Sequence, residues 1–295
     1  MFRVRRLLAP FVLCIALLFS EAQAFTIAWL SDTQNYHNAY KPIFDGMTQW
    51  IADNREALDI RFVFHTGDVV GSWSSEDQWR QARESMGILS SASIPFLAAC
   101  GNHDIGYRMN YANFLKYVLS LRPASMSQEY GDTGSRYELF SANGRDYIFM
   151  GIAFSNKGPS EDEVNWINGV LRQYSSRDAI IITHSYLKKS ASYTTQGKAI
   201  FEKIVKANPN VFLVLCGHCR DISYKNVQLD DDGDGDPDRT VYAILSNFQG
   251  SKAGGGGYMR ILDFRDDDIY LYTYSPYYDS REYPKGKTEA TVPLP

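Results

Sequence analysis

The chain has few cysteines, four in 295 residues. One, Cys14, lies in the apolar N-terminal segment, and the remaining three are an odd number far below that of a disulfide-rich scaffold. Cys216 and Cys219 have redox-motif spacing but flank a Gly-His turn instead of opening a helix, which argues against a thioredoxin-like role. Cys100 and Cys216 each follow an apolar run. Two explanations stay open for them: small buried residues at strand ends, or a disulfide between adjacent strands.

The chain also lacks a cluster of basic residues. Its formal charge is -4, and removal of the first 24 residues, which hold three arginines and one glutamate and so carry +2, lowers it to -6. Proteins track a phosphate backbone with concentrated positive charge, so we expect no specific nucleic-acid binding. The 44% of apolar and 14% of aromatic residues are ample for a buried core and exclude disorder of the whole chain.

No apolar run reaches the roughly 20 residues that span a bilayer. The longest, residues 7–19, follows three arginines and precedes Ala22-Gln23-Ala24, the small-x-small pattern that a signal peptidase cleaves. We interpret residues 1–24 as a signal peptide cleaved before Phe25, and residues 25–295 as one exported domain, periplasmic or secreted, without a membrane span. The alternative is an uncleaved membrane anchor.

Strand and helix patterns alternate along the first two thirds of the chain. Apolar runs of strand length are found at 25–30, 61–65, 94–99, 179–182 and 211–215. Amphipathic helical patterns follow at 43–51, 74–89, 110–120, 160–171 and 197–207. Ser74 with Asp77, and Ser160 with Glu163, have the spacing of a capping box at a helix start. This order predicts an α/β domain.

Antiparallel strands are expected as well. Asn143-Gly144 is a strong hairpin signal between strands at 136–140 and 146–152. Further strands are expected at 223–229, 240–247, 258–264 and 269–274. The acidic loop 230–238 alternates carboxylates as calcium loops do, but a solvated hairpin tip is the explanation we favour. The glycine run 254–257 has no following helix and no phosphate-loop lysine, so it is weak evidence for nucleotide binding.

Polar residues that can ligate a metal follow the apolar strands. Strands end at one edge of an open α/β sheet, where ligands bind. Carboxylate and amide oxygens mixed with imidazole suit zinc, manganese or iron. Any one of these residues alone is better explained as a helix cap or a core group, but together they indicate a metal site. They are Asp32, Asp68, Asn102, His103, His184 and His218.

The ordered motifs resemble those of the calcineurin-like metallophosphoesterases, which include the purple acid phosphatases. The family pattern is Asp-x-His, Gly-Asp, Gly-Asn-His-(Asp/Glu), a lone His and Gly-His-x-His. This chain matches it with Asp32-Thr33-Gln34, Gly67-Asp68, Gly101-Asn102-His103-Asp104, His184 and Gly217-His218-Cys219-Arg220. The resemblance implies a two-layer β-sandwich flanked by helices, with divalent metal ions (Mn, Zn or Fe), one or two per chain.

The resemblance assigns ligands to two half-sites. Asp68 bridges them, and the second metal takes Asn102, His184 and His218. The first metal takes Asp32 and two histidines, whose positions hold Gln34 and Arg220 in this chain. Gln34 still offers an amide oxygen, whereas the permanent cation of Arg220 cannot ligate.

Three states of the first half-site stay open. A metal binds weakly through Asp32, Asp68, Gln34 and Asp221 or water; no metal binds and Arg220 supplies positive charge; or the site is degenerate and the chain is a binding module.

The resemblance also implies an activity, the hydrolysis of phosphoric mono- or diesters of small molecules. A divalent metal lowers the pKa of its water, and the resulting hydroxide attacks phosphorus in line. His103 is the candidate general acid, oriented by Asp104, and Arg220 is a candidate for gripping phosphoryl oxygens. We expect His65 to be structural and leave open whether His37 lines the cleft.

Two rival functions stay open beside phosphoester hydrolysis. One is a catalytically weak or inactive metal-binding module, and the other is a metal-dependent nuclease, which the negative charge disfavours. Tyrosines at 107, 111, 186 and 270–278 are either an aromatic rim for an organic leaving group or half-buried strand residues.

Overall fold

The protein is described by a computed structural model, in which residues 24–107, 109–121, 128–283 and 288–295 are described. The predicted signal peptide lies outside them except for its last residue, so cleavage and export stay predictions. None of the described helices is both long and apolar enough to span a membrane.

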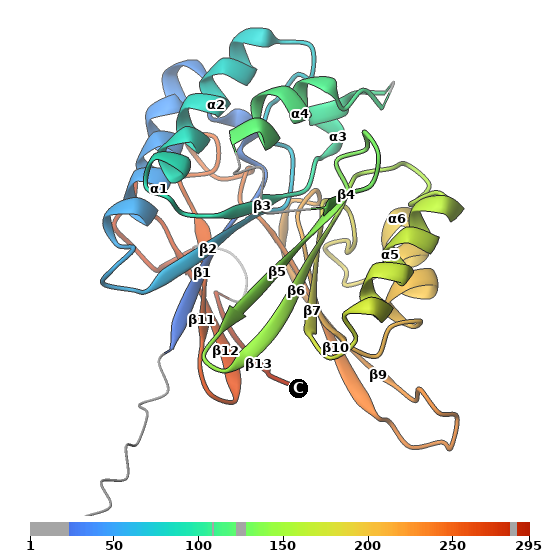
Figure 1. Cartoon of the computed structure of the whole chain (residues 1–295). Coiled ribbons are helices and arrows are strands. Elements are labelled where there is room, and N and C mark those ends of the chain that lie inside the picture. The colour runs from blue at the N-terminus through green and yellow to red at the C-terminus, as the bar shows by residue number, and fades with distance from the viewer. Residues whose placement is uncertain (1–23, 108, 122–127, 284–287) are drawn as a thin grey trace, which may run out of the picture.

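Two β-sheets form the layers of a sandwich (Figure 1). The first sheet, in spatial order, consists of β13 (Glu289–Pro293), β12 (Asp268–Tyr274), β11 (Met259–Phe264), β1 (Phe25–Leu30), β2 (Ile60–His65) and β3 (Phe96–Ala98). The second consists of β4 (Gln128–Glu129), β5 (Arg136–Ala142), β6 (Arg145–Ile152), β7 (Asp178–Thr183), β8 (Val211–Cys216), β10 (Arg239–Asn247) and β9 (Asp221–Leu229). The predicted two-layer sandwich is therefore confirmed.

Each sheet has a block of parallel strands with antiparallel pairs beside it. The neighbours β1, β2 and β3 are parallel, as are β6, β7, β8 and β10, whereas β11, β12 and β13 pair antiparallel. The β5–β6 pair is the hairpin that Asn143-Gly144 predicts, and both turn residues have positive φ. Parallel strands end at the same edge, which brings the residues after β1, β2, β3, β7 and β8 together.

Helices cover the outer faces of the sandwich (Figure 1). The helices are α1 (Lys41–Asp53), α2 (Glu76–Ser91), α3 (Asn102–Ile105), α4 (Ala112–Tyr117), α5 (Glu161–Gln173) and α6 (Thr195–Ile200), with short helical turns at Thr33–Asn35, Asn38–Tyr40, Leu119–Leu121 and Phe201–Val205. The apolar faces of α1 and α2 pack on the first sheet, and that of α5 packs on the second. The central strands β1, β2, β7 and β8 are thus buried on both faces.

Aromatic side chains fill the space between the sheets. Phe64 of β2 meets Phe149 of β6 edge to face, with ring centroids 4.9 Å apart. Along β1, Ile27 and Trp29 point into this core while Ala28 and Leu30 point toward the helices. This two-sided burial explains why β1 is apolar at every position except Thr26.

Some element boundaries differ from those expected. The N-cap of α2 is Ser75, whose hydroxyl accepts from the Gln78 amide, and not Ser74. The expected helix 110–120 is divided into α4 and a separate turn, and that of 197–207 becomes α6 followed by the π-helical turn η4 (Phe201–Val205). The short strands β4 and β13 have no clear signal in the sequence. Ser160 caps α5 as predicted.

Candidate metal centre

Five strands end at one edge of the sandwich, and a polar residue from the motifs follows each of them. Asp32, Asp68 and Asn102 follow strands of the first sheet, whereas His184 and His218 follow strands of the second. The candidate centre therefore lies where the two layers meet, with oxygen ligands on one side and imidazoles on the other.

Tight turns aim these side chains. Asp32, Asp68 and His218 all have a left-handed backbone, with φ of 52°, 54° and 68°. Glycines allow the turns to approach closely: a Cβ on Gly101 would lie 2.1 Å from Asp68 Oδ1, and one on Gly217 would lie 2.2 Å from Asp32 Oδ2. Both motif glycines are thus required by the close approach of a carboxylate.

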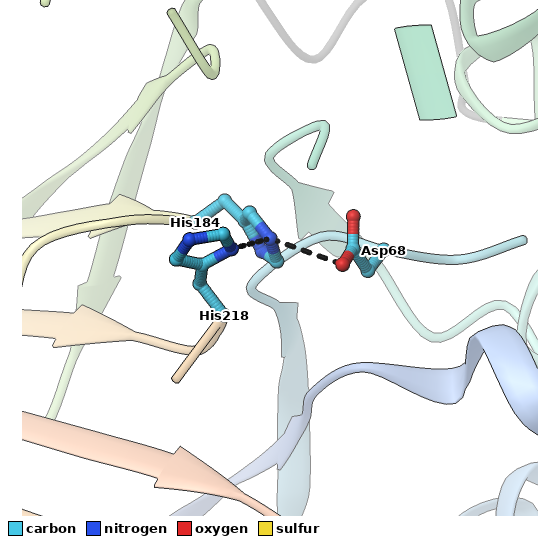
Figure 2. A group of neighbouring side chains, drawn as sticks. All are labelled: Asp68, His184 and His218. Carbon is cyan, nitrogen blue, oxygen red and sulfur yellow. Dashed lines mark hydrogen bonds and ion pairs between the residues drawn. The ribbon is translucent and has the colours of Figure 1, made fainter. Parts of the chain in front are cut away.

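Three side chains converge on His184 Nε2. This atom lies 3.2 Å from Asp68 Oδ2, 3.2 Å from Asn102 Oδ1 and 3.1 Å from His218 Nδ1. Figure 2 shows the His184 ring between Asp68 and His218, with all three side chains pointing toward one another. Ligand atoms of Asp68, His184 and His218 all lie within 4.8 Å of one another, so the three could hold one metal ion.

The other ring nitrogen of His184 supports this assignment. Nδ1 lies 2.9 Å from the carbonyl oxygen of Thr66, which can only accept, so Nδ1 carries a proton. In the neutral ring Nε2 then presents its lone pair to Asp68, Asn102 and His218. A backbone carbonyl that fixes the tautomer in this way is a usual companion of a metal-ligating histidine.

Charges in the centre are strongly coupled. Burial lowers the pKa of His184, but the carboxylates of Asp68 and Asp32 raise it more, to about 9. Burial raises the pKa of Asp68, but His184 and the His103 amide outweigh it, and the net shift is downward. Burial and the neighbouring His184 lower the pKa of His218 to about 4. A divalent cation would replace the proton of His184, so binding should release a proton.

Asp32 and Gln34 line the neighbouring half-site. Asp32 accepts from the Ser31 hydroxyl at 2.5 Å, and both of its oxygens lie 3.2 Å from the His218 amide nitrogen. Burial raises the pKa of Asp32 to about 7. Gln34 is buried, and its Oε1 has no hydrogen-bond partner among the described residues. A buried acceptor without a donor is costly, which marks this position as one that takes a water or a ligand.

Arg220 lies on the same turn as His218, but its side chain is exposed. Within the described residues it forms no ion pair or hydrogen bond, and its Cδ is 3.5 Å from where a Cβ on Gly250 would lie. Asp221, the expected alternative ligand, instead forms an ion pair with Lys189 at 2.5 Å and accepts from the Ile222 amide. The structure thus does not place Asp221 among the ligands.

His103 stands at the solvent side of the centre. Its amide donates to Asp68 Oδ1 at 2.9 Å, and its exposed ring contacts the Gly71 carbonyl through Nδ1 at 2.9 Å. The Gly71 carbonyl, and not Asp104 as we expected, therefore orients this ring. Nε2 of this ring has no hydrogen-bond partner among the described residues.

Asp104 has another task. Its buried carboxylate accepts from the amides of Val69, Val70 and Gly101 at 2.8–3.0 Å. These bonds tie the turn after Asp68 to the turn that carries Asn102 and His103. Burial and Asp68 raise the pKa of Asp104 to about 7. Asp104 is thus a positioning residue that acts through the backbone.

Two other histidines lie nearby. His65 is fully buried, with Nδ1 accepting from the Gly67 amide at 3.1 Å and Nε2 3.0 Å from the Thr33 hydroxyl, as a structural histidine would be. Burial lowers its pKa to about 3. His37 is half-buried, and its Nε2 lies 3.9 Å from where a Cβ on Gly71 would be.

Three residues of the centre were not singled out by sequence reasoning. Ser31 and Thr66, which orient Asp32 and His184, could have been noticed because they stand next to the motif carboxylates. Phe154 packs against both imidazoles, with ring centroids 5.9 Å from His184 and 6.0 Å from His218. Nothing in the sequence around Phe154 signals this contact, because it depends on how β6 lies beside β7.

The tyrosines do not form a single rim. Tyr186 is buried in the second sheet's helix-facing core and cannot line the cleft. Tyr111 donates to the Phe154 carbonyl at 3.2 Å, whereas Tyr107 is 78% exposed just after α3. Tyr274 packs on Trp50 of α1, with ring centroids 4.7 Å apart. Tyr107 and Tyr111 stay candidates for substrate contacts, as do the exposed Tyr277 and Tyr278.

The described cysteines are all free. Cys100 follows β3 of the first sheet and Cys216 ends β8 of the second, so they are buried residues at strand ends and not a bridge between adjacent strands. The acidic loop is an exposed tip between β9 and β10, as expected. Carboxylate oxygens of Asp230, Asp232 and Asp238 do lie within 4.8 Å of one another there.

Solved structures share this fold at low sequence identity. A dimetal phosphatase from Danio rerio superposes with a TM-score of 0.60 at 12% identity, over 91% of this chain and 98% of that one. GAP50, the anchor in the inner membrane complex of Plasmodium, superposes with a TM-score of 0.59 at 13% identity, over 92% of this chain and 89% of that one. Purple acid phosphatase PPD1 from yellow lupin gives 0.57 at 13%, over 92% and 54%. At these identities the likeness concerns the fold alone.

Sequence comparisons assign the family. The uncharacterized protein YvnB of Bacillus subtilis is 41% identical over 265 residues, which are 88% of this chain but only 20% of that protein. The chain thus spans about a fifth of the length of this relative. The family model described as calcineurin-like phosphoesterase matches residues 25–219, most of the chain. The chain belongs to the calcineurin-like phosphoesterase family.

Proposed function

We propose that the chain is a metal-dependent hydrolase of phosphoric mono- or diesters of small molecules. The observation that carries this proposal is the convergence of Asp68, Asn102 and His218 on His184 Nε2 at the edge where the strands end. These four side chains would hold a divalent ion such as Mn, Zn or Fe. The family to which the chain belongs supports the same reaction class.

Each residue has a distinct part in this proposal. A bound divalent ion supplies a Lewis acid that polarises a phosphoryl oxygen and lowers the pKa of water. The Asn102 amide and Arg220 stabilise charge on the phosphoryl oxygens. His103, held through Nδ1 by Gly71, gives a proton from Nε2 to the leaving oxygen. Its ring is exposed, so it can take up another proton from solvent.

The predicted signal peptide supports a location outside the cytoplasm. We infer that the mature chain begins at Phe25 and acts in the periplasm or as a secreted protein. Fractionation of cells that express the chain, with N-terminal sequencing, tests this. A cytosolic protein that keeps residues 1–24 would contradict it.

Hydrolysis assays test the enzymatic proposal. We expect purified protein with Mn, Zn or Fe to hydrolyse p-nitrophenyl phosphate or its bis ester, and the metal-free protein to be inactive. His218→Ala should lose bound metal and turnover together, while His65→Asn, which changes a buried structural histidine, should keep both. Turnover that survives in His218→Ala would refute the assignment.

A metal-binding module without catalysis is the second candidate. The replacement of two histidines of the family pattern by Gln34 and Arg220 favours it. The fold of the Plasmodium protein whose name describes an anchor is compatible with such a role. Metal bound in a one-to-one ratio, with neither ester hydrolysed, is the result expected from this candidate.

A further inference from the structure

The half-site beside the converging ligands departs from the composition that two metal ions require. Its members are Asp32, Gln34 and Arg220, and this inference about them rests on the proposed function. Imidazole and carboxylate groups would fit a second divalent ion. Here one neutral amide and one permanent cation stand where imidazoles would stand.

Asp32 does not join a cluster of ligands. Among the described histidines, cysteines and acids, the group at this edge with three ligand atoms within 4.8 Å consists of Asp68, His184 and His218. The carboxylate of Asp32 instead accepts from Ser31 and from the His218 amide. These bonds hold the turn of Gly217 and His218 in place, so Asp32 has a structural task that does not depend on a cation.

Gln34 offers a buried acceptor to this space. The side chain is only 6% exposed, and no donor among the described residues reaches Oε1. The short helical turn Thr33–Asn35 fixes its position, since Asn35 Nδ2 donates to the carbonyls of Gln249 and Gly254. A water molecule could satisfy Oε1 from within the half-site.

Arg220 brings a positive charge to the turn that also carries His218. Its stem lies along Gly250, and Asn247 of the same segment donates to the His218 carbonyl at 3.1 Å. No carboxylate among the described residues pairs with its guanidinium. Such a group repels a second cation, and its fork of donors matches two oxygens of a phosphate.

We propose that this half-site binds phosphate oxygens and water instead of a second metal ion. Arg220 donates to the phosphoryl oxygens of the substrate, and Gln34 Oε1 accepts from a water molecule beside them. The protein therefore holds one divalent ion per chain, at Asp68, Asn102, His184 and His218. The positive charge that a second ion would supply comes from Arg220.

Metal stoichiometry tests this directly. Elemental analysis of the purified protein after Mn loading and gel filtration should give one ion per chain. Gln34→His/Arg220→His, which restores both imidazoles, should give two, and the control Arg172→His, at an exposed arginine of α5, should stay at one. Two ions in the unchanged protein, or one in the double variant, would overturn the inference.

Phosphate binding supplies an independent readout. Calorimetric titration of the Mn-loaded protein with inorganic phosphate should show binding that Arg220→Ala weakens by about tenfold to a hundredfold. Arg220→Lys keeps the charge but loses the two parallel N–H donors of the guanidinium. Its phosphate affinity should lie between those of the unchanged protein and Arg220→Ala. Equal affinity in the unchanged protein and Arg220→Ala would overturn the inference. A protein that binds no metal at all would instead refute the proposed function, so the two failures can be told apart.

Discussion

Left-handed turns give the metal centre its geometry. Asp32, Asp68 and His218 all have positive φ, a conformation that costs free energy for residues other than glycine. Hydrogen bonds hold these turns: the Asp32 carboxylate accepts from the His218 amide, and Asp68 accepts from the His103 amide. The fold thus directs Asp68 and His218 toward the candidate site before any ion binds. Metal binding should therefore require little rearrangement of the protein, which favours affinity.

A substitution at Gly101 tests how closely the turn that carries Gly101 must approach the turn that carries Asp68. A Cβ at this position would lie 2.1 Å from Asp68 Oδ1 and 2.4 Å from its amide nitrogen. We predict that Gly101→Ala lowers the free energy of unfolding by about 2 kcal/mol and weakens metal binding, because the backbone must shift. Urea denaturation and metal titration measure both. The control Gly169→Ala, with nothing within 4 Å, should leave metal binding unchanged; equal metal affinity in Gly101→Ala would contradict the account.

His65 should make stability depend on pH. Burial lowers its pKa from 6.5 to about 3, so below pH 6.5 the unfolded chain binds a proton that the folded chain does not. The contribution of the neutral His65 side chain to the unfolding free energy is complete above pH 6.5 and is lost progressively as the pH falls toward 3. Between pH 7 and 5 this loss is about 2 kcal/mol of unfolding free energy.

Replacing His65 isolates this effect. His65→Asn keeps an acceptor near the Nδ1 position for the Gly67 amide but cannot titrate. Urea denaturation at pH 7 and pH 5 should therefore show a smaller loss in the variant than in the unchanged protein. Equal losses would mean that His65 is not the group responsible.

Residue types were easier to predict than their partners. The sequence singles out Asn102, His184 and His218 as candidate ligands because each follows an apolar strand within a motif, and the structure brings the three together. That Asp104 binds backbone amides, and that Gly71 orients His103, depends on how two turns pack together. A single sequence holds no signal for such contacts.

Among the elements, α2 offers a matched pair of tests. Ser75 caps its first turn, and Gly87 lies in its interior with nothing within 4 Å of an added Cβ. We predict that Ser75→Ala lowers the unfolding free energy by about 1 kcal/mol and that Gly87→Ala raises it by about 0.5–1 kcal/mol. Urea denaturation measures both, and a loss of stability in Gly87→Ala would contradict the packing described for α2.

Long buried strands were predicted better than short elements. The expected strand 25–30 is β1 itself, because burial on both faces favours a run that is apolar at every position except Thr26. By contrast, β4 pairs through only two residues. The sequence of β13 has no strand pattern of its own, and its pairing with β12 is visible only in the structure. The π-helical turn after α6 likewise follows from packing on the second sheet and not from helix propensity.

At the scale of the whole molecule, the candidate metal centre lies where the two sheets meet. Asp68 and Asn102 belong to one layer, whereas His184 and His218 belong to the other. We predict that saturating metal stabilises the folded chain, by about 2.7 kcal/mol at a free concentration 100 times its Kd. Thermal unfolding with Mn and with a chelator measures this. His218→Ala should remove the difference, and a full shift in that variant would place the ion elsewhere.

The altered half-site likewise depends on contacts between segments that lie far apart in the sequence. The sequence identified Gln34 and Arg220 as departures from the family pattern but left three states open. The missing information was spatial: a segment 30 residues beyond Arg220 packs against its stem and against Asn35. With these contacts, the half-site of Asp32, Gln34 and Arg220 becomes a candidate phosphate site.

We propose that one metal ion, held by Asp68, Asn102, His184 and His218, drives phosphoester hydrolysis. Titration of metal-free protein with Mn, at a protein concentration far above Kd, with measurement of the initial rate of p-nitrophenyl ester hydrolysis, tests this proposal. We predict a rate that rises linearly and stops rising at one ion per chain. Hydrolysis that needs no metal, or a rate that rises until two ions are bound, would contradict the account.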